Sequence, residues 1–126
     1  MTENAPADRA LPDNGLPSPR DLAAVPAVEV IATLAVHLMT AAAVQLGLGD
    51  LDEDGMAHPA DLDEARKLIT ALAGLVTAAA PEIGSQHAAP LRDGLRTLQL
   101  AFREVSVLPD PPGSAPGEKL TGPVLP

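Results

Sequence analysis

The longest apolar stretch of the chain runs from Pro26 to Gly47 and predicts a helix. Ala, Val, Leu, Ile and Met fill most of its positions, so we expect it to be buried over most of its circumference. Its polar residues recur at spacings of four, four and three and therefore share one narrow stripe: Glu29, Thr33, His37 and Thr40. Pro26 suits a first helical turn, and Gly47 suits the left-handed conformation just past a helix end.

Two amphipathic helices are predicted after an acidic turn. The second helix begins at Asp61, where Glu64 three residues later approximates a capping box, and Pro81 should close it. The third helix follows a loop over 82–87 and runs over 88–105. Both carry apolar residues at alternating spacings of three and four, at Leu62, Ala65, Ile69, Leu72, Val76 and Ala79 in the second and at Leu91, Leu95, Leu98, Phe102 and Val105 in the third.

The two ends of the chain show no such periodicity. Residues 1–25 are rich in Ala, Pro and Asp, and residues 108–126 are rich in Pro and Gly, so we expect both to be disordered tails. The sequence therefore predicts an all-α protein, a small antiparallel three-helix bundle over 26–107 with a tail at each end. The second and third helices each have only one apolar stripe, so together they cover the helix over 26–47 incompletely. We therefore expect self-association, most simply a two-fold dimer through that helix.

The charge and the amino-acid composition make several classes of function and of binding site improbable. The formal net charge is -9, which disfavours direct contact with nucleic-acid phosphates or an anionic lipid surface. Cysteine is absent, so no disulfide framework, thiolate zinc site or thiol nucleophile is expected. Phe102 is the single aromatic residue, and the N-terminal residues lack the basic and apolar regions of a signal peptide. We therefore expect a cytoplasmic protein.

Membrane association is the main alternative to that location. The stretch Val30–Leu48 carries no charge and is long enough to span a bilayer. It lacks the flanking aromatic residues and basic clusters that membrane spans favour. Since two amphipathic helices are available to bury it, we favour a soluble core helix and keep membrane anchorage as the alternative.

The order of apolar helix, short acidic turn, DLDEARKLITALAGL and LRDGLRTLQLAF is also informative. It resembles the uncharacterised bacterial family named domain of unknown function eighteen forty-four, in its actinobacterial form. The resemblance covers 28–104, and its most specific piece is Asp61-Leu62-x-x-Ala65-Arg66-x-x-Ile69. It implies a helical fold with no established activity and gives no catalytic residue. It also implies a genetic setting beside translation genes, so a role near the translation apparatus is an expectation.

The acidic turn contains a calcium-loop pattern. Asp50, Asp52 and Asp54 alternate before Gly55, and Asp61 stands at the twelfth position of the loop. Against a metal site, Asp is too short there for easy bidentate contact, Ala57 replaces the usual β-branched residue, and Pro59 stiffens the exit. We favour a solvated acidic turn in which Asp61 caps the second helix, with a calcium-binding module as the alternative.

Two further sets of side chains are candidates for interaction. His37 could act as a proton-responsive switch at an interface, although we favour a core histidine that is hydrogen-bonded to Thr33 or Thr40. Three arginines form a basic ridge on the third helix that could engage an acidic protein or an RNA backbone, or could be a solvated face paired with nearby acids: Arg92, Arg96 and Arg103.

The chain shows no arrangement typical of catalysis. Its serines have no recognisable partner base, no Gly-rich loop follows a strand, and the carboxylates of the acidic turn lack an apolar cleft. We therefore expect no enzyme activity and no cofactor. The predicted function is that of a non-catalytic interaction or structural protein with an unidentified protein partner.

Overall fold

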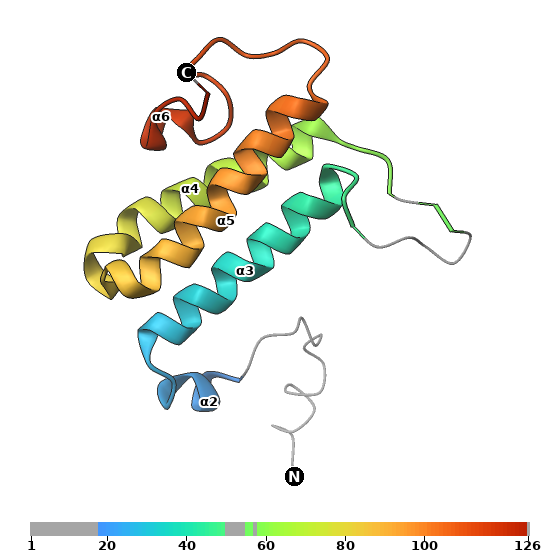
Figure 1. The fold of residues 1–126 in the computed structure, drawn as a ribbon. Helices are drawn as coiled ribbons and strands as arrows, with labels where there is room; N and C mark the ends of the chain where they lie inside the picture. Colours follow the sequence, from blue (N-terminus) through green and yellow to red (C-terminus); the bar gives the residue numbers. More distant parts are fainter. Residues whose placement is uncertain (1–17, 50–54, 57, 126) are drawn as a thin grey trace.

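The structure, a computed structural model, describes residues 18–49, 55, 56 and 58–125. These residues form helices and connecting segments without strands, which confirms the prediction of an all-α protein. The helices are α2 (Pro19–Ala23), α3 (Ala27–Gln45), α4 (Leu62–Ile83), α5 (Ser85–Val105) and α6 (Glu118–Thr121) (Figure 1).

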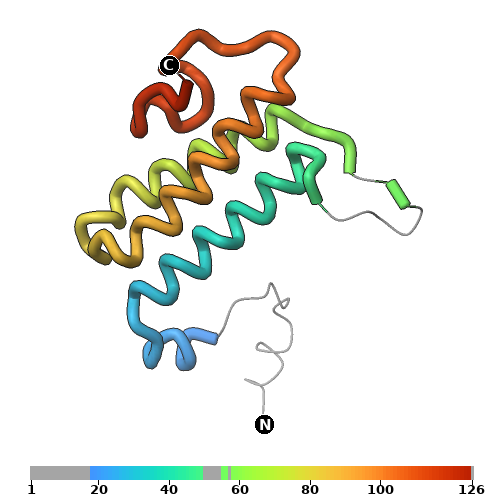
Figure 2. The backbone as a smooth tube through the Cα atoms, viewed as in Figure 1, coloured from blue at the N-terminus to red at the C-terminus, as the bar shows by residue number. Residues whose placement is uncertain are grey.

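The three long helices pack against one another as a bundle. Figure 2 shows α4 running antiparallel to both α3 and α5, and each of the three contacts the other two. One residue, Gly84, separates α4 from α5, in place of the loop expected over 82–87. Its φ of +86° makes the tight reversal possible. Pro81 lies inside the last turn of α4 and does not close the helix, because the Gly84 N–H still donates to the Ala80 carbonyl at 3.0 Å.

The turn after α3 ends in the conformation that the sequence predicts. Gly47 has a φ of +81°, and the Leu48 N–H donates to the Ala43 carbonyl at 2.9 Å. The Asp61 N–H donates to the Gln45 carbonyl at 2.7 Å, which joins the end of α3 to the start of α4. The Asp61 carboxylate then accepts from the Glu64 N–H at 3.2 Å and caps α4 as expected.

The core lies between the facing sides of α3, α4 and α5. The large buried side chains come from α4 and α5, whereas α3 contributes Ala35 and Ala42, followed by Leu46 at its end. The expectation that α3 is buried over most of its circumference is therefore wrong. Both of its neighbours lie on the same side, so the opposite side of α3 faces outward. The core cluster consists of Ala35, Ala42, Leu46, Ala65, Ile69, Leu72, Ala73, Val76, Leu91, Leu95, Leu98 and Phe102.

The C-terminal segment is not the flexible tail predicted over 108–126. Its described residues fold back over the bundle, and α6 contacts α4 (Figures 1 and 2). Ala115, Glu118 and Val124 are buried there. A Pro- and Gly-rich segment can be ordered when side chains of a helical scaffold bind its backbone, and α5 supplies such side chains.

The other predicted tail is described in part. Residues 1–17 lie outside the described residues, and Ser18 caps the short helix α2 by accepting from the Asp21 N–H at 3.3 Å. No residue of α2 is buried. This helix lies within the range 1–25 that was expected to be disordered, so the disorder prediction does not hold for residues 19–23.

A large-to-small substitution tests the α4–α5 core. Leu72 is fully buried, so Leu72→Ala should lower the free energy of unfolding by about 2–5 kcal/mol through lost burial and the cavity that remains. Urea denaturation followed by circular dichroism measures the change. Val107 is 89% exposed, and Val107→Ala should change the stability by less than about 0.5 kcal/mol. Similar losses in both variants would contradict this assignment of the core.

Candidate interaction surface

Of the three long helices, α3 has the fewest buried residues, and one of its sides faces outward. Within this helix of nineteen residues only two, Ala35 and Ala42, are buried, although the mean hydropathy reaches 1.9. By length and composition α3 is also able to cross a membrane. Val36 is 54% exposed and Leu34 is 39% exposed. The exposed residues of α3 beyond its first position are Glu29, Thr33, Leu34, Val36, His37 and Thr40.

A shallow groove follows this side of the helix. Its lining is mostly apolar and contains no acidic or basic residue other than one histidine. We call this lining the α3 face, and it consists of Ala32, Thr33, Val36, His37, Thr40 and Ala41. A surface of small, uncharged side chains can approach another apolar surface closely without stripping water from a charge.

His37 lies on the α3 face and not in the core. Its side chain is exposed, and it makes no hydrogen bond with Thr33 or Thr40. The favoured interpretation of His37 as a hydrogen-bonded core residue is therefore wrong. The polar stripe of α3 points away from α4 and α5, so His37 remains a candidate for an interface.

The three arginines predicted to form one basic ridge divide into two groups. Arg92 and Arg96 are exposed and line a groove of about 330 Å³ between α5 and the C-terminal segment. Arg96 donates to the Val124 carbonyl at 3.4 Å. Arg103 points instead into the protein, where its side chain is 9% exposed, so it is not available to an external partner.

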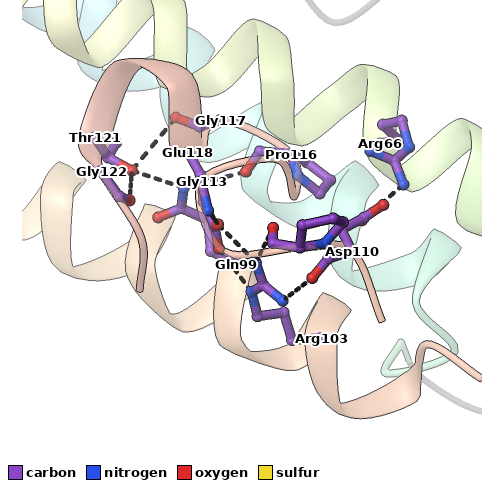
Figure 3. A network of polar contacts seen from close by, with 11 residues as sticks. Arg66, Gln99, Arg103, Asp110, Gly113, Pro116, Gly117, Glu118, Thr121 and Gly122 are labelled. Atoms are coloured by element: carbon purple, nitrogen blue, oxygen red, sulfur yellow. Dashed lines mark hydrogen bonds and ion pairs between the residues drawn. The ribbon is translucent and has the colours of Figure 1, made fainter. Parts of the chain in front are cut away.

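Arg103 organises the fold of residues 110–124, which we call the C-terminal clasp. Its Nε and Nη2 donate to the two carboxylate oxygens of Glu118 at 2.7 and 2.6 Å (Figure 3). Nη1 donates to the Asp110 carbonyl at 2.9 Å, and Nη2 also donates to the Pro111 carbonyl at 3.2 Å. The Gly113 N–H donates to Glu118 Oε1 at 2.8 Å. This fork-to-fork geometry is the strong form of an ion pair.

Two more side chains of the bundle hold the clasp. Gln99 is 2% exposed, and its Nε2 donates to the Pro116 carbonyl and to Thr121 Oγ1, each at 3.1 Å (Figure 3). Arg66 Nη2 contacts Asp110 Oδ2 at 2.9 Å. Across the described part of the chain no buried side-chain nitrogen or oxygen lacks a hydrogen-bond partner. The buried polar side chains of the clasp therefore all have hydrogen-bond partners within the protein.

The ion pair shifts the protonation of both of its members. The Arg103 guanidinium lowers the pKa of Glu118 below its ordinary value of 4.5, the Gly113 N–H adds to this effect, and burial opposes it. The hydrogen bond to Glu118 raises the pKa of Arg103. Both shifts favour the charged pair at neutral pH.

The calcium prediction lies mostly outside the described residues. Asp50, Asp52 and Asp54 belong to the part of the chain that is not described, while Asp61 caps α4. Within the described ranges no three His, Asp or Glu side chains gather as metal ligands would. His58 Nε2 lies 3.2 Å from Gln45 Oε1 and helps to join the two ends of the α3–α4 connection.

Sequence reasoning did not find the residues that hold the clasp. Gln99 stands beside the arginines on the polar face of the predicted third helix, and Glu118 lies in the range 108–126 that was expected to be a disordered tail. In the structure Gly117 and Gly122 bracket the four residues of α6 and both have positive φ. The sequence of a Pro- and Gly-rich segment does not by itself distinguish such a turn from a flexible tail.

Acidification should reveal the contribution of Glu118. Because its folded-state pKa is lowered, its stabilisation is fully present above the ordinary carboxyl pKa and is lost as the pH falls through the folded-state value. Glu118→Gln should therefore destabilise the protein at pH 7, and the difference from wild type should shrink below about pH 4. Urea denaturation over a pH series measures it. Glu104 is exposed, and Glu104→Gln should show no such trend; a constant difference for Glu118→Gln would contradict the ion pair.

A pair of glycine substitutions tests how closely the clasp packs. Gly117 has a φ of +80°, and an added Cβ would lie 2.8 Å from Ala73 Cβ and 2.9 Å from Gln99 Nε2. Gly117→Ala should lower the free energy of unfolding by more than about 1 kcal/mol. Gly74→Ala, inside α4 with open space around the added Cβ, should raise it by about 0.5–1 kcal/mol. Thermal denaturation compares the two variants, and equal stabilities would contradict the clasp.

Comparison with known proteins places this fold in a family. The family model described as Domain of unknown function (DUF1844) matches residues 27–104, which span α3, α4 and nearly all of α5. No curated protein and no solved structure matches the chain. Since the match covers more than half of the sequence and all three helices of the bundle, the protein belongs to the DUF1844 family.

Proposed function

We propose that the protein is a non-catalytic interaction module that docks through the α3 face. The observation that carries this proposal is the long apolar helix with two buried residues out of nineteen. The outward side exposes Leu34 and Val36 beside the polar residues of its stripe, and apolar side chains that are exposed together can mark an interaction site. Val107 and Leu108 are more exposed than either, but they lie on the segment after α5, so we assign the docking role to α3, which exposes apolar side chains on a long helix of the bundle.

The distribution of charge supports docking at this position. The chain carries a net charge of -9, yet α3 contains a single charged residue, Glu29, in its first turn. Charge elsewhere on the surface keeps the protein soluble, while the uncharged α3 face can be desolvated at little cost. The clasp adds rigidity to the scaffold, because it ties the last turns of α5 to α4.

The proposal includes a cytoplasmic location and a place near the translation apparatus. The location is carried over from the sequence-based expectation, and the place near the translation apparatus from the family resemblance. The exposed Arg92 and Arg96 offer a small basic surface for a contact with such a particle.

Membrane attachment through α3 is the second candidate. The nineteen residues of α3 span about 28 Å at 1.5 Å each, close to the roughly 30 Å of a bilayer core. Insertion would require α3 to leave α4 and α5, which would expose Ile69, Leu72 and Phe102 to water. Docking of the intact bundle avoids that cost, and we therefore favour it.

Density-gradient fractionation of a native lysate tests the proposal. Tagged wild-type protein should migrate ahead of the monomer, and Val36→Glu, which places a charge on the α3 face, should return it to the monomer position. The matched control is Val107→Glu, because Val107 is exposed on the segment after α5. It should migrate like wild type. Circular dichroism verifies that both variants are folded.

Each other outcome of this experiment has a meaning. Wild-type protein at the monomer position, or a Val36→Glu variant that migrates like wild type, would overturn docking through the α3 face. Wild-type protein that sediments with membranes and requires detergent for release would favour the second candidate. Migration with ribosomal particles that is lost in Arg92→Gln would support the translation part of the proposal.

A further inference from the structure

We propose that the groove between α5 and the C-terminal clasp binds the carboxyl-terminal residue of a peptide, whose carboxylate is held by Arg92 and Arg96. This inference goes beyond the proposed function, which treats the two arginines as a small basic surface and assigns docking to the α3 face. It is carried by the charge of the groove, by the spacing of its polar groups along α5 and by one amide oxygen of a buried side chain.

The groove is basic although the chain as a whole is acidic. The sequence contains seventeen acidic residues against eight lysines and arginines, yet the two charged residues that line the groove are both arginines. Arg92 forms no ion pair or hydrogen bond with another residue in the described part of the chain. Arg96 uses one of its N–H donors on the Val124 carbonyl. Both guanidinium groups therefore keep donors for an external anion.

The two arginines are spaced to bind the same carboxylate. They lie four residues apart on α5, so their Cβ atoms are about 5–6 Å apart on one side of the helix. Guanidinium groups at this separation can both donate to one carboxylate, and charge-assisted hydrogen bonds of this kind are roughly twice as strong as neutral ones. Gln99 stands seven residues after Arg92 and lies only about 20° away around the helix axis, so it is on the same side.

Gln99 supplies a hydrogen-bond acceptor to the same groove. The residue is 2% exposed and lines the groove, and its Nε2 donates to the Pro116 carbonyl and to Thr121 Oγ1 (Figure 3). The first of these bonds fixes the orientation of the amide, since a carbonyl oxygen only accepts. Oε1 accepts from no group in the described part of the chain. Because no fully buried side-chain oxygen among these residues lacks a partner, Oε1 reaches the open groove.

Apolar side chains make up the rest of the groove. Val76 and Leu95 line it from α4 and α5 and are buried, whereas Leu120 lines it from the clasp and is 51% exposed. An aliphatic side chain of a ligand would cover Leu120 and remove apolar surface of both partners from water. The volume of about 330 Å³ lies at the lower end of the range of ligand pockets, roughly 300–1,000 Å³.

These features together select the ligand. A carboxylate satisfies the two arginines, an N–H close to it satisfies Gln99 Oε1, and an aliphatic side chain covers Leu120. The carboxyl-terminal residue of a peptide carries all three groups. A nucleic-acid phosphate has no N–H beside its charge, and a chain of phosphates would be repelled by the net charge of -9. The end of a peptide is therefore the occupant that the groove favours.

Titration of the isotope-labelled full chain with the peptide acetyl-Ala-Ala-Leu, followed by NMR, tests the proposal. Saturable chemical-shift changes should be centred on residues 92–99 and 120–124. The same peptide with a carboxyl-terminal amide should bind at least about tenfold more weakly, because it lacks the charge that the arginines bind. Equal binding of the acid and the amide, or shift changes centred on another part of the chain, would overturn the proposal.

Arginine variants test which side chains hold the carboxylate. Arg92→Gln and Arg96→Gln should each weaken binding of the free acid at least about threefold and leave binding of the amide nearly unchanged. Arg20→Gln is the matched control, because Arg20 is exposed on α2, away from the groove (Figure 1). It should bind the acid like wild type. An equal loss in all three variants would mean that net charge alone sets the affinity and would contradict the assignment.

Two further probes test the peptide character of the ligand without any change in the protein. The ester analogue, in which an oxygen replaces the leucine N–H, keeps the carboxylate but offers no donor to Gln99 Oε1. It should bind at least about threefold more weakly than acetyl-Ala-Ala-Leu. Inorganic phosphate should bind more weakly than the peptide acid. Phosphate that binds as tightly as the acid, or an ester that does so, would overturn the peptide end as the occupant.

Discussion

The bundle depends on the packing of α4 against α5, because these two helices supply its large buried side chains. Ile69, Leu72, Leu95 and Phe102 are all enclosed between them and the inner side of α3. α3 contributes alanines at its closest approach, so it can lie near its neighbours but adds little volume to the core. Because α3 packs on the core through small side chains on one side, apolar residues on its other side, such as Leu34 and Val36, stay exposed. The uncovered side of α3 is a direct result of how the core volume is divided among the three helices.

The order and type of the long helices could be read from the sequence, because their apolar spacings are regular and Gly47 and Asp61 mark the turn between the first two. The reversal at Gly84 could not, since a loop was expected over 82–87. The depth of burial of α3 could not be read in the same way. Alanine is compatible with a core, with a close helix contact and with an exposed surface, and an Ala-rich helix therefore has no sharply defined buried side. Thr33, His37 and Thr40 did mark one direction, and only the packing shows that this direction faces outward.

The C-terminal clasp escaped prediction for a different physical reason. Its order does not come from local periodicity but from a few polar contacts with residues fifteen or more positions earlier, such as Glu118 with Arg103 and Thr121 with Gln99. Such contacts leave no repeating pattern in the sequence. Pro and Gly, which usually indicate flexibility, here provide the fixed and the positive φ values that a compact irregular segment requires.

The clasp shows that the range matched by the family model is shorter than the folded unit of this protein. The segment that the family model recognises stops at residue 104, whereas Arg103 and Gln99, both inside it, have their partners beyond it. A chain cut at the recognised boundary would keep a guanidinium and an amide whose burial depends on the missing residues. The range that the family model matches is therefore only part of what folds together here. The C-terminal clasp lies outside that range, so membership of the family does not by itself predict it.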